Sequence, residues 1–132
     1  MTGEKSKFFL CKRTNYNQKF SRTIASLEDA RSLESAIKKF NPQIIIHLAA
    51  QAGVRYSIEN PEVYIDSNVS GFLNILECCR HFNIKRLVYG SSSSVYGNSN
   101  NIPFSELSSV DKPVSLYAAT KKTNELMAYT YS

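Results

Sequence analysis

Residues 44–49 read Ile-Ile-Ile-His-Leu-Ala, an apolar and largely β-branched run without polar alternation. A strand that is buried on both faces of a parallel sheet has this composition, because helices cover it from both sides. A second strand pattern, Arg-Leu-Val-Tyr-Gly-Ser, occupies residues 86–91, and a helical pattern from Pro61 to about Phe82 separates the two. Strand, long helix and strand in this order predict a right-handed βαβ unit. The sequence therefore predicts an α/β fold with a parallel sheet and flanking helices.

Two more helices are expected outside this unit. Residues 27–40 place apolar side chains at helical spacing, with Ser26 as the N-cap and Pro42 just beyond the end. Residues 117–132 are rich in Ala, Lys, Glu, Leu and Met, which favour a helix. The glycine, proline and asparagine residues between 97 and 115 predict a loop.

The chain length and the charge distribution define the domain organisation. The chain has 132 residues, of which 42% are hydrophobic and 20% charged, as expected for one globular domain. The net charge of +5 lies entirely in residues 1–40, which hold nine Lys and Arg against four Asp and Glu. We expect residues 1–19 to form a basic, poorly ordered arm. Residues 20–132 form the domain, with a short strand near residues 20–25.

Several classes of protein are excluded by composition. Three cysteines without a Cys-x-x-Cys spacing argue against a disulfide scaffold and against a metal site. No apolar run is long enough to span a bilayer, and we expect a cytoplasmic protein without a membrane partner. A basic arm can attract nucleic acid, but no recognition motif accompanies it, so we expect no nucleic-acid partner.

Two strand ends carry residues suited to chemistry, because ligands of open α/β sheets bind beyond the carboxyl ends of the strands. The first strand continues into residues 48–53, whose small side chains let a ligand approach the backbone. The second ends in four serines, residues 91–94, and buried hydroxyls need partners. A binding site and a simple serine-rich turn both explain the serines. We interpret His47, inside the first strand, as a structural core residue.

Tyr117 and Lys121 form a third candidate feature. Residues four apart share one helix face, and a nearby cation favours the ionised form of a phenol. A tyrosine in this position can act as a general base. Taken alone the spacing is weak evidence, since a surface tyrosine beside a lysine stem is the commoner explanation.

With the two strand ends and the Tyr117–Lys121 pair in this order, the sequence resembles the extended short-chain dehydrogenases/reductases, specifically the NAD-dependent epimerase/dehydratase group. The resemblance covers roughly residues 20–132 and is strongest to UDP-glucuronate 4-epimerases. It implies a Rossmann-like fold. It rests on the stretches 47–57 (His-Leu-Ala-Ala-Gln-Ala-Gly-Val-Arg-Tyr-Ser), 66–68, 71–77, 91–97, 113–122 and 124–128.

The resemblance implies three catalytic residues. Tyr117 corresponds to the catalytic base, and Lys121 favours its ionised form and holds the nicotinamide ribose of NAD. Both therefore also count as cofactor-binding residues. Ser92 corresponds to the residue that hydrogen-bonds the reacting sugar hydroxyl.

The resemblance also implies binding residues for the cofactor and the substrate. Ala49 and Ala50 line the NAD site, and Asn68 lies near the nicotinamide. Arg55 and Ser93 are candidates for contacting a nucleotide sugar such as UDP-glucuronate, although Arg55 is explained equally well as a loop residue facing solvent. No metal is implied.

The implied reaction is 4-epimerisation, in which the sugar is transiently oxidised at C4 and then reduced on its other face. Dehydratase relatives carry acidic residues at the positions of Ser93 and Ser94, and this departure favours epimerisation. Another epimerase, decarboxylase or dehydratase activity of the same group remains the alternative.

Two departures from the family bear on activity. No Gly-x-Gly-x-x-Gly or Gly-x-x-Gly-x-x-Gly loop for the cofactor pyrophosphate occurs, and nothing corresponds to the substrate-binding part. We therefore expect a fragment with an incomplete Rossmann-like sheet, weak or no NAD binding and no turnover. The strand at 44–49 is expected to have an exposed edge. The alternative that is not an enzyme is a non-catalytic interaction protein. In that case the chain would dimerise through helices 62–82 and 117–132.

Overall fold

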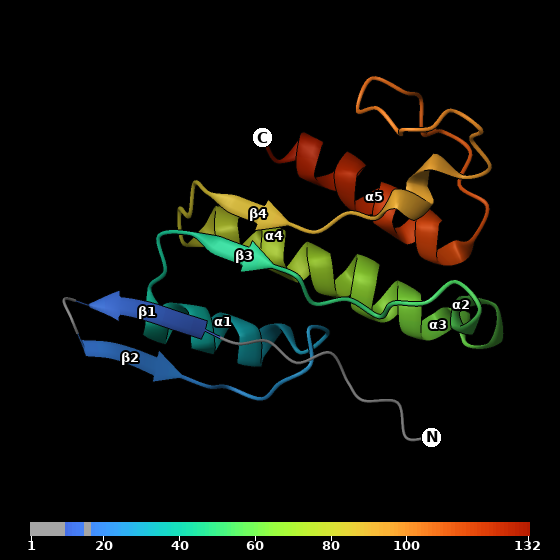
Figure 1. The fold of residues 1–132 in the computed structure, drawn as a ribbon. Coiled ribbons are helices and arrows are strands. Elements are labelled where there is room, and N and C mark those ends of the chain that lie inside the picture. The colour runs from blue at the N-terminus through green and yellow to red at the C-terminus, as the bar shows by residue number, and fades with distance from the viewer. Residues whose placement is uncertain (1–9, 15–16) are drawn as a thin grey trace.

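The computed structural model describes residues 10–14 and 17–132. Figure 1 shows how its helices and strands follow one another along the chain. The elements are β1 (Leu10–Thr14), β2 (Asn17–Ser21), α1 (Ala30–Phe40), β3 (Ile45–His47), α2 (Tyr56–Glu59), α3 (Pro61–Tyr64), the π-helix η1 (Ile65–Ser70), α4 (Gly71–His81), β4 (Leu87–Tyr89), the 3-10 helix η2 (Ser93–Tyr96) and α5 (Leu116–Thr130).

The centre of the fold is the parallel pair of β3 and β4. Ile45 lies opposite Leu87 and His47 opposite Tyr89, so the two strands run in the same direction over three residues each. The helical run from α3 through α4 connects them. This arrangement confirms the predicted α/β fold with an incomplete, Rossmann-like parallel sheet.

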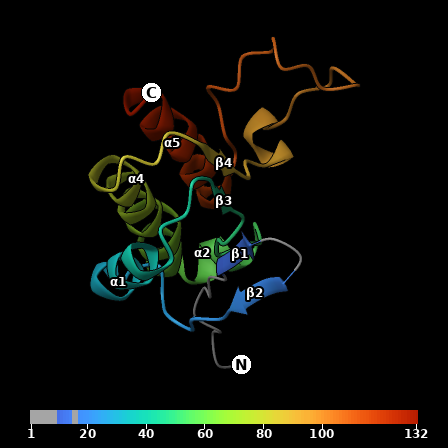
Figure 2. The same ribbon diagram turned by 90° about the vertical axis from the view of Figure 1, so that its left-hand side faces the viewer.

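Among the described elements, helices cover only one face of this small sheet. Helices α1, α4 and α5 lie on the same side of β3 and β4 (Figure 2). Ile46 is 67% exposed, and Leu48 and Val88 are exposed as well, whereas Ile45 and His47 are buried. The prediction that residues 44–49 are buried on both faces is therefore wrong for the described residues, because no helix packs on the second face.

The hydrophobic core lies between α1, α4 and the covered face of the sheet. Leu27, which precedes α1, is completely buried and contacts the first turn of α4. Burial raises the pKa of the Cys78 thiol to about 11, which agrees with a packing role for this residue. The core cluster comprises Leu27, Leu33, Ala36, Ile37, Ile45, Ile75, Cys78 and Ile84.

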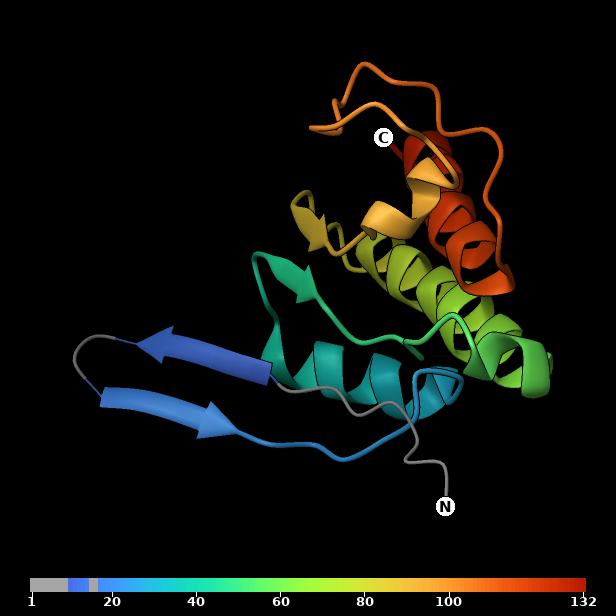
Figure 3. The same ribbon diagram turned by 45° about the vertical axis from the view of Figure 1, so that its right-hand side comes forward.

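The N-terminal strands form a separate antiparallel hairpin. Leu10 pairs with Ser21 and Thr14 with Asn17, and this sheet shares no strand with the β3–β4 pair (Figure 3). The strand predicted at 20–25 is therefore wrong beyond Ser21, because the ladder with β1 sets its limits. Among the described strands β3 pairs only with β4, and the exposed edge expected for residues 44–49 stays a prediction. Residues 1–9 of the predicted arm lie outside the described residues, and the boundary at residue 19, which β2 crosses, stays a prediction.

Helix α1 begins three residues later than predicted. Asp29, not Ser26, is its N-cap, and its carboxylate accepts a hydrogen bond from the Ser32 backbone N–H at 3.1 Å. The Ser26 carbonyl instead accepts from the Asp29 N–H at 3.2 Å, in a turn that precedes the helix. Asn41 ends the helix in a left-handed conformation with φ of 48°. The turn leaves Leu27 free to enter the core.

The helix predicted from Pro61 to Phe82 is present but not uniform. It begins as α3, continues through the π-helix η1 and ends as α4 at His81. The short helix α2 precedes it and was not predicted. Helix α5 begins at Leu116, where the Ser115 hydroxyl accepts a hydrogen bond from the Ala118 N–H at 3.1 Å. The π-helix faces α5, and this contact builds the candidate site.

The close approach of α4 to Leu27 makes a stability prediction. A Cβ at Gly71 would lie 2.7 Å from the Leu27 Cβ. We expect Gly71→Ala to lower the free energy of unfolding by about 1 kcal/mol, because overpacking by roughly 1–3 kcal/mol outweighs the better helix propensity of alanine. Urea unfolding followed by circular dichroism measures the change. The matched control is Gly90→Ala, where the nearest atom, Leu48 Cδ2, is at an ordinary 3.6 Å. Equal stability of the two variants would contradict the packing described here.

Candidate active site

The candidate site lies beyond the carboxyl ends of β3 and β4, where helix α5 begins. The segment after β3 runs along η1, and the segment after β4 forms η2, which packs on α5. The sequence predicted chemistry at both strand ends and at the start of this helix. The fold brings these three regions to one edge of the sheet.

Asn68 joins the β3 loop to α5. Its Oδ1 accepts a hydrogen bond from the Gln51 backbone N–H at 2.8 Å, and its Nδ2 lies 3.0 Å from the Gln51 carbonyl oxygen. The same Nδ2 lies 3.1 Å from Thr120 Oγ1 on α5. Asn68 is only 2% exposed, so its whole amide is used inside the protein. This residue therefore fixes the loop against the helix.

The π-helix gives Asn124 a partner. Asn124 Nδ2 donates to the backbone carbonyl of Asn68 at 2.6 Å, and both residues are buried. A π-turn alters the regular helical hydrogen bonding, and such turns recur at functional sites. One turn earlier on α5, the Thr120 hydroxyl donates to the Tyr117 carbonyl at 2.8 Å. The bonds from Asn68 to Thr120 and from Asn124 to Asn68 set the register of α5 against η1.

Tyr117 packs against a buried tyrosine from α3. Its ring centroid lies 6.1 Å from that of Tyr64, and the rings meet edge to face at 75°. Tyr64 is fully buried, and its hydroxyl lies 2.8 Å from the Ala52 carbonyl oxygen and 2.6 Å from that of Gly53. Tyr117 itself is partly exposed, as a residue that meets a ligand must be.

Lys121 is a buried cation that forms no ion pair with a carboxylate of the described residues. It is 6% exposed, and the ion pairs found in residues 22–132 do not include it. Burial lowers the pKa of Lys121, while the charge of Glu125 acts in the opposite direction. Glu125 is itself engaged, with Lys122 at 3.2 Å and the Ser91 hydroxyl at 2.6 Å. A buried ammonium that forms no ion pair is suited to an anionic or hydroxylic ligand.

His47 is a second buried titratable residue, and the charge of Lys121 acts on it. It is 8% exposed and its ring lies 5.5 Å from that of Phe72. Burial first, and then the positive charge of Lys121, lower the pKa of His47 from 6.5 to about 4. The imidazole is therefore neutral at pH 7, which agrees with the predicted structural role.

The serine run forms the N-terminal cap of η2. Ser92 is partly buried, and its Oγ accepts a hydrogen bond from the Ser94 backbone N–H at 3.2 Å. Ser93 is exposed. In the described part of the chain no hydrogen bond joins Ser92 to Tyr117. Ser92 caps η2, which packs on α5, the helix that carries Tyr117.

The remaining predicted residues lie on the β3 side. Ala49 and Ala50 are partly buried and lead directly into Gln51, which Asn68 holds. Arg55 is exposed at the start of α2, and no hydrogen bond or ion pair ties it to the predicted catalytic residues in the described chain.

Sequence reasoning missed Tyr64, Thr120, Asn124 and Gln51 as parts of this site. Tyr64 and Asn68 are four residues apart, as are Thr120 and Asn124, so each pair shares a helix face. That spacing was the available signal. The partners, however, come from different segments, which only the fold brings together.

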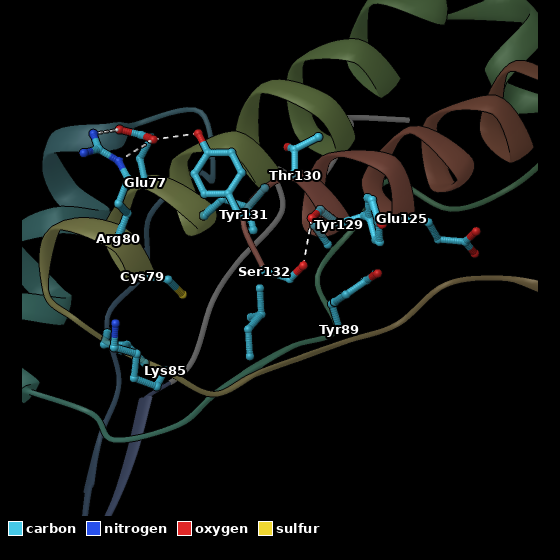
Figure 4. A pocket seen from close by; sticks show the side chains of 14 residues that line it. Glu77, Cys79, Arg80, Lys85, Tyr89, Glu125, Tyr129, Thr130, Tyr131 and Ser132 are labelled. Atoms are coloured by element: carbon cyan, nitrogen blue, oxygen red, sulfur yellow. Dashed lines mark hydrogen bonds and ion pairs between the residues drawn. The ribbon is translucent and has the colours of Figure 1, made fainter.

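A separate groove lies at the other end of α5. It has a volume of about 1110 Å³, and Tyr89, Glu125 and Tyr129 are among its lining residues (Figure 4). Glu77 pairs with Arg80 at 2.6 Å and accepts a hydrogen bond from the Tyr131 hydroxyl at 2.6 Å. None of the predicted site residues lines this groove.

The family assignment follows from comparison with known proteins. The family described as GDP-mannose 4,6 dehydratase matches residues 4–132. With the partial Rossmann-like sheet, this match defines the class of protein. The chain belongs to the epimerase/dehydratase family of extended short-chain dehydrogenases/reductases.

Similar sequences include Protein CapI of Staphylococcus aureus, 57% identical over 115 residues, and a probable UDP-glucuronate 4-epimerase of Rhizobium meliloti, 50% identical over 113 residues. These alignments cover 87% and 86% of this chain but 34% and 33% of the relatives. The chain therefore spans about a third of the length of the curated relatives that it matches.

Similar solved structures are sugar-nucleotide epimerases. A UDP-glucose 4-epimerase from Brucella ovis in complex with NAD has a TM-score of 0.79 and 29% identity, over 86% of this chain and 35% of that one. A UDP-glucose 4-epimerase from Thermus thermophilus, also in complex with NAD, has a TM-score of 0.76 and 34% identity, over 81% and 35%.

The residues that the structure describes were searched for metal-binding clusters and for membrane-spanning helices. They contain no cluster of three or more metal-binding side chains. None of their helices combines the length and apolar character needed to cross a membrane.

The neutral, buried His47 predicts how stability depends on pH. Because its pKa falls to about 4 on folding, the unfolded chain binds more protons between pH 6.5 and 4, and stability falls as the pH falls. We expect His47 to account for a loss of about 2 kcal/mol between pH 7 and pH 5. Urea unfolding at both pH values, compared with His47→Gln, isolates this contribution. The control is His81→Gln, which removes an exposed histidine. An identical pH dependence in the wild type and His47→Gln would refute the assignment.

Proposed function

We propose that this chain carries the catalytic tyrosine, lysine and serine of a nucleotide-sugar 4-epimerase that converts UDP-glucuronate to UDP-galacturonate with NAD. The observation that carries the proposal is Lys121. It is buried, has no carboxylate partner among the described residues and follows Tyr117 by one helical turn at the carboxyl edge of a parallel sheet.

The residues at this edge fit a dinucleotide. Ala49 and Ala50 have small side chains at the end of β3, where a flat ligand can approach the backbone. Lys121 supplies an ammonium for the nicotinamide ribose. Asn68 is fully hydrogen-bonded inside the protein, so we assign it to holding the cofactor loop rather than to contacting NAD. NAD supplies reversible hydride acceptance, which the side chains of a protein cannot provide.

The residues of this chain move and hold the protons. Tyr117 takes the proton from the sugar 4-hydroxyl as C4 is oxidised and returns it after the sugar has been reduced on its other face. Lys121 stabilises the ionised phenol. The Ser92 hydroxyl hydrogen-bonds the same sugar hydroxyl and orients it. Exposed Arg55 and Ser93 are available to the nucleotide sugar.

The names of similar proteins support UDP-glucuronate as the substrate. The Rhizobium meliloti relative and four Arabidopsis thaliana relatives are described as UDP-glucuronate 4-epimerases. The description of the matching family favours a second candidate, 4,6-dehydration of a nucleotide sugar. Ser93 and Ser94, where dehydratases carry acidic residues, count against it. We further propose a homodimer through residues 62–82 and 117–132.

A cofactor titration tests the chain by itself. We expect weak or no saturable enhancement of NADH fluorescence when the chain is added, because its sequence has no glycine-rich loop to bind the pyrophosphate. The control is the double variant Tyr117→Phe plus Lys121→Ala. Tight, saturable binding that this variant loses would show that the chain builds a cofactor site without the glycine loop.

A chimera tests the chemistry. Residues 45–132 replace the matching segment of the Rhizobium meliloti relative, and the formation of UDP-galacturonate from UDP-glucuronate is followed by chromatography. We expect an active chimera that Tyr117→Phe slows by at least about 100-fold, the usual contribution of a general base.

The matched control in the chimera is Tyr129→Phe, since Tyr129 is 82% exposed on the same helix. The proposed role of Tyr117 fails if both phenylalanine variants are equally active. A 4-keto-6-deoxy sugar as the product would instead support the dehydratase.

A further inference from the structure

Tyr64 is a fully buried side chain that the proposed mechanism does not use. It lies at the end of α3, and it contacts two parts of the site at once. Its ring meets that of Tyr117 edge to face, and its hydroxyl reaches the carbonyl oxygens of Ala52 and Gly53. We propose that Tyr64 is a positioning residue that fixes the ring of Tyr117 relative to the loop after β3. The inference rests on the proposed role of Tyr117.

The ring contact sets the orientation of Tyr117. At a centroid distance of 6.1 Å and an interplanar angle of 75°, the two rings have the edge-to-face geometry that aromatic pairs prefer. Tyr117 is partly exposed, and solvent alone would not select one ring orientation. The buried ring of Tyr64 provides the fixed surface against which Tyr117 packs.

The hydroxyl of Tyr64 anchors the loop. It has one proton to donate and two carbonyl oxygens within 2.8 Å, so the loop has two acceptors for one donor. Gly53 has φ of +107°, a conformation that glycine adopts without strain, and this conformation presents its carbonyl to Tyr64. Burial raises the pKa of Tyr64, although a hydrogen bond with Gln51 acts in the opposite direction. The phenol therefore keeps its proton and remains a donor.

Asn68 repeats this connection one turn further along. It binds Gln51 in the same loop and Thr120 on α5, just as Tyr64 binds Ala52 and Gly53 and packs on Tyr117. Tyr64 and Asn68 are four residues apart and share one helix face. Together they hold the loop after β3 against α5 at two points. Of the two residues, Tyr64 is the one whose side chain packs on Tyr117, the proposed base.

The test uses the 132-residue chain with 13C-labelled tyrosine, with Tyr117→Phe identifying the Tyr117 ring signals in NMR spectra. We expect Tyr64→Leu to move the ring signals of Tyr117 toward those of free tyrosine, because the ring current of Tyr64 is lost. We expect Tyr64→Phe to keep those signals close to the wild type. In the same variant, hydrogen exchange at the Gln51 amide should become at least about 10-fold faster, because the loop has lost its anchor.

Tyr131→Phe is the matched control. It removes a tyrosine hydroxyl that hydrogen-bonds Glu77 at the far end of the same helix. It should change neither the Tyr117 signals nor exchange at Gln51.

The outcomes separate the inference from the proposed function. Unchanged Tyr117 signals in Tyr64→Leu would overturn it, as would equal effects of Tyr131→Phe. If Tyr64→Leu does not fold, unchanged exchange at Gln51 in Tyr64→Phe overturns it. None of these readouts needs NAD or turnover, so an inactive chimera would refute the proposed function while leaving the contact between Tyr64 and Tyr117 established.

Discussion

The candidate site depends on the hydrogen bonds that the side-chain amide of Asn68 makes. This amide is buried, and it binds the Gln51 backbone on one side and Thr120 on the other. A buried polar group left without a partner costs roughly 1–3 kcal/mol, so the loop and α5 are held to each other through this residue. Asn124 completes the arrangement by binding the backbone carbonyl of the same residue. These bonds hold α5, which carries Tyr117 and Lys121, in one register against η1.

This register also determines the electrostatics of the site. It buries Lys121 near His47, and the unfavourable approach of two cations is avoided because burial and the lysine charge keep the imidazole neutral. The ammonium itself has no carboxylate partner in the described chain. The site therefore holds a buried ammonium, on which the charge of Glu125 acts, one helical turn after the partly exposed Tyr117.

Much of the fold followed from local patterns. The apolar runs predicted both strands of the parallel sheet, and helical spacing predicted α1 and the α3–α4 run, because these periods report which side of an element is buried. Composition predicted α5. The errors lie where tertiary contacts decide: the turn at Ser26 that moves the cap of α1 to Asp29, the exposed Ile46, and the hairpin that ends at Ser21. For the site, the sequence named Tyr117, Lys121 and Asn68 by resemblance, but their mutual placement came from the fold.

By itself, the sequence indicated the α/β class through composition and spacing along single helices and strands, and its resemblance to a known family indicated the family and the candidate site residues. Only the tertiary structure decided which of those residues meet. The contact of Tyr64 with Tyr117 joins residues 53 positions apart, and the bond from Asn124 to Asn68 joins residues 56 positions apart. No local period encodes such contacts. The first forms because two aromatic rings pack edge to face, and the second because η1 and α5 bury an amide donor against a backbone carbonyl.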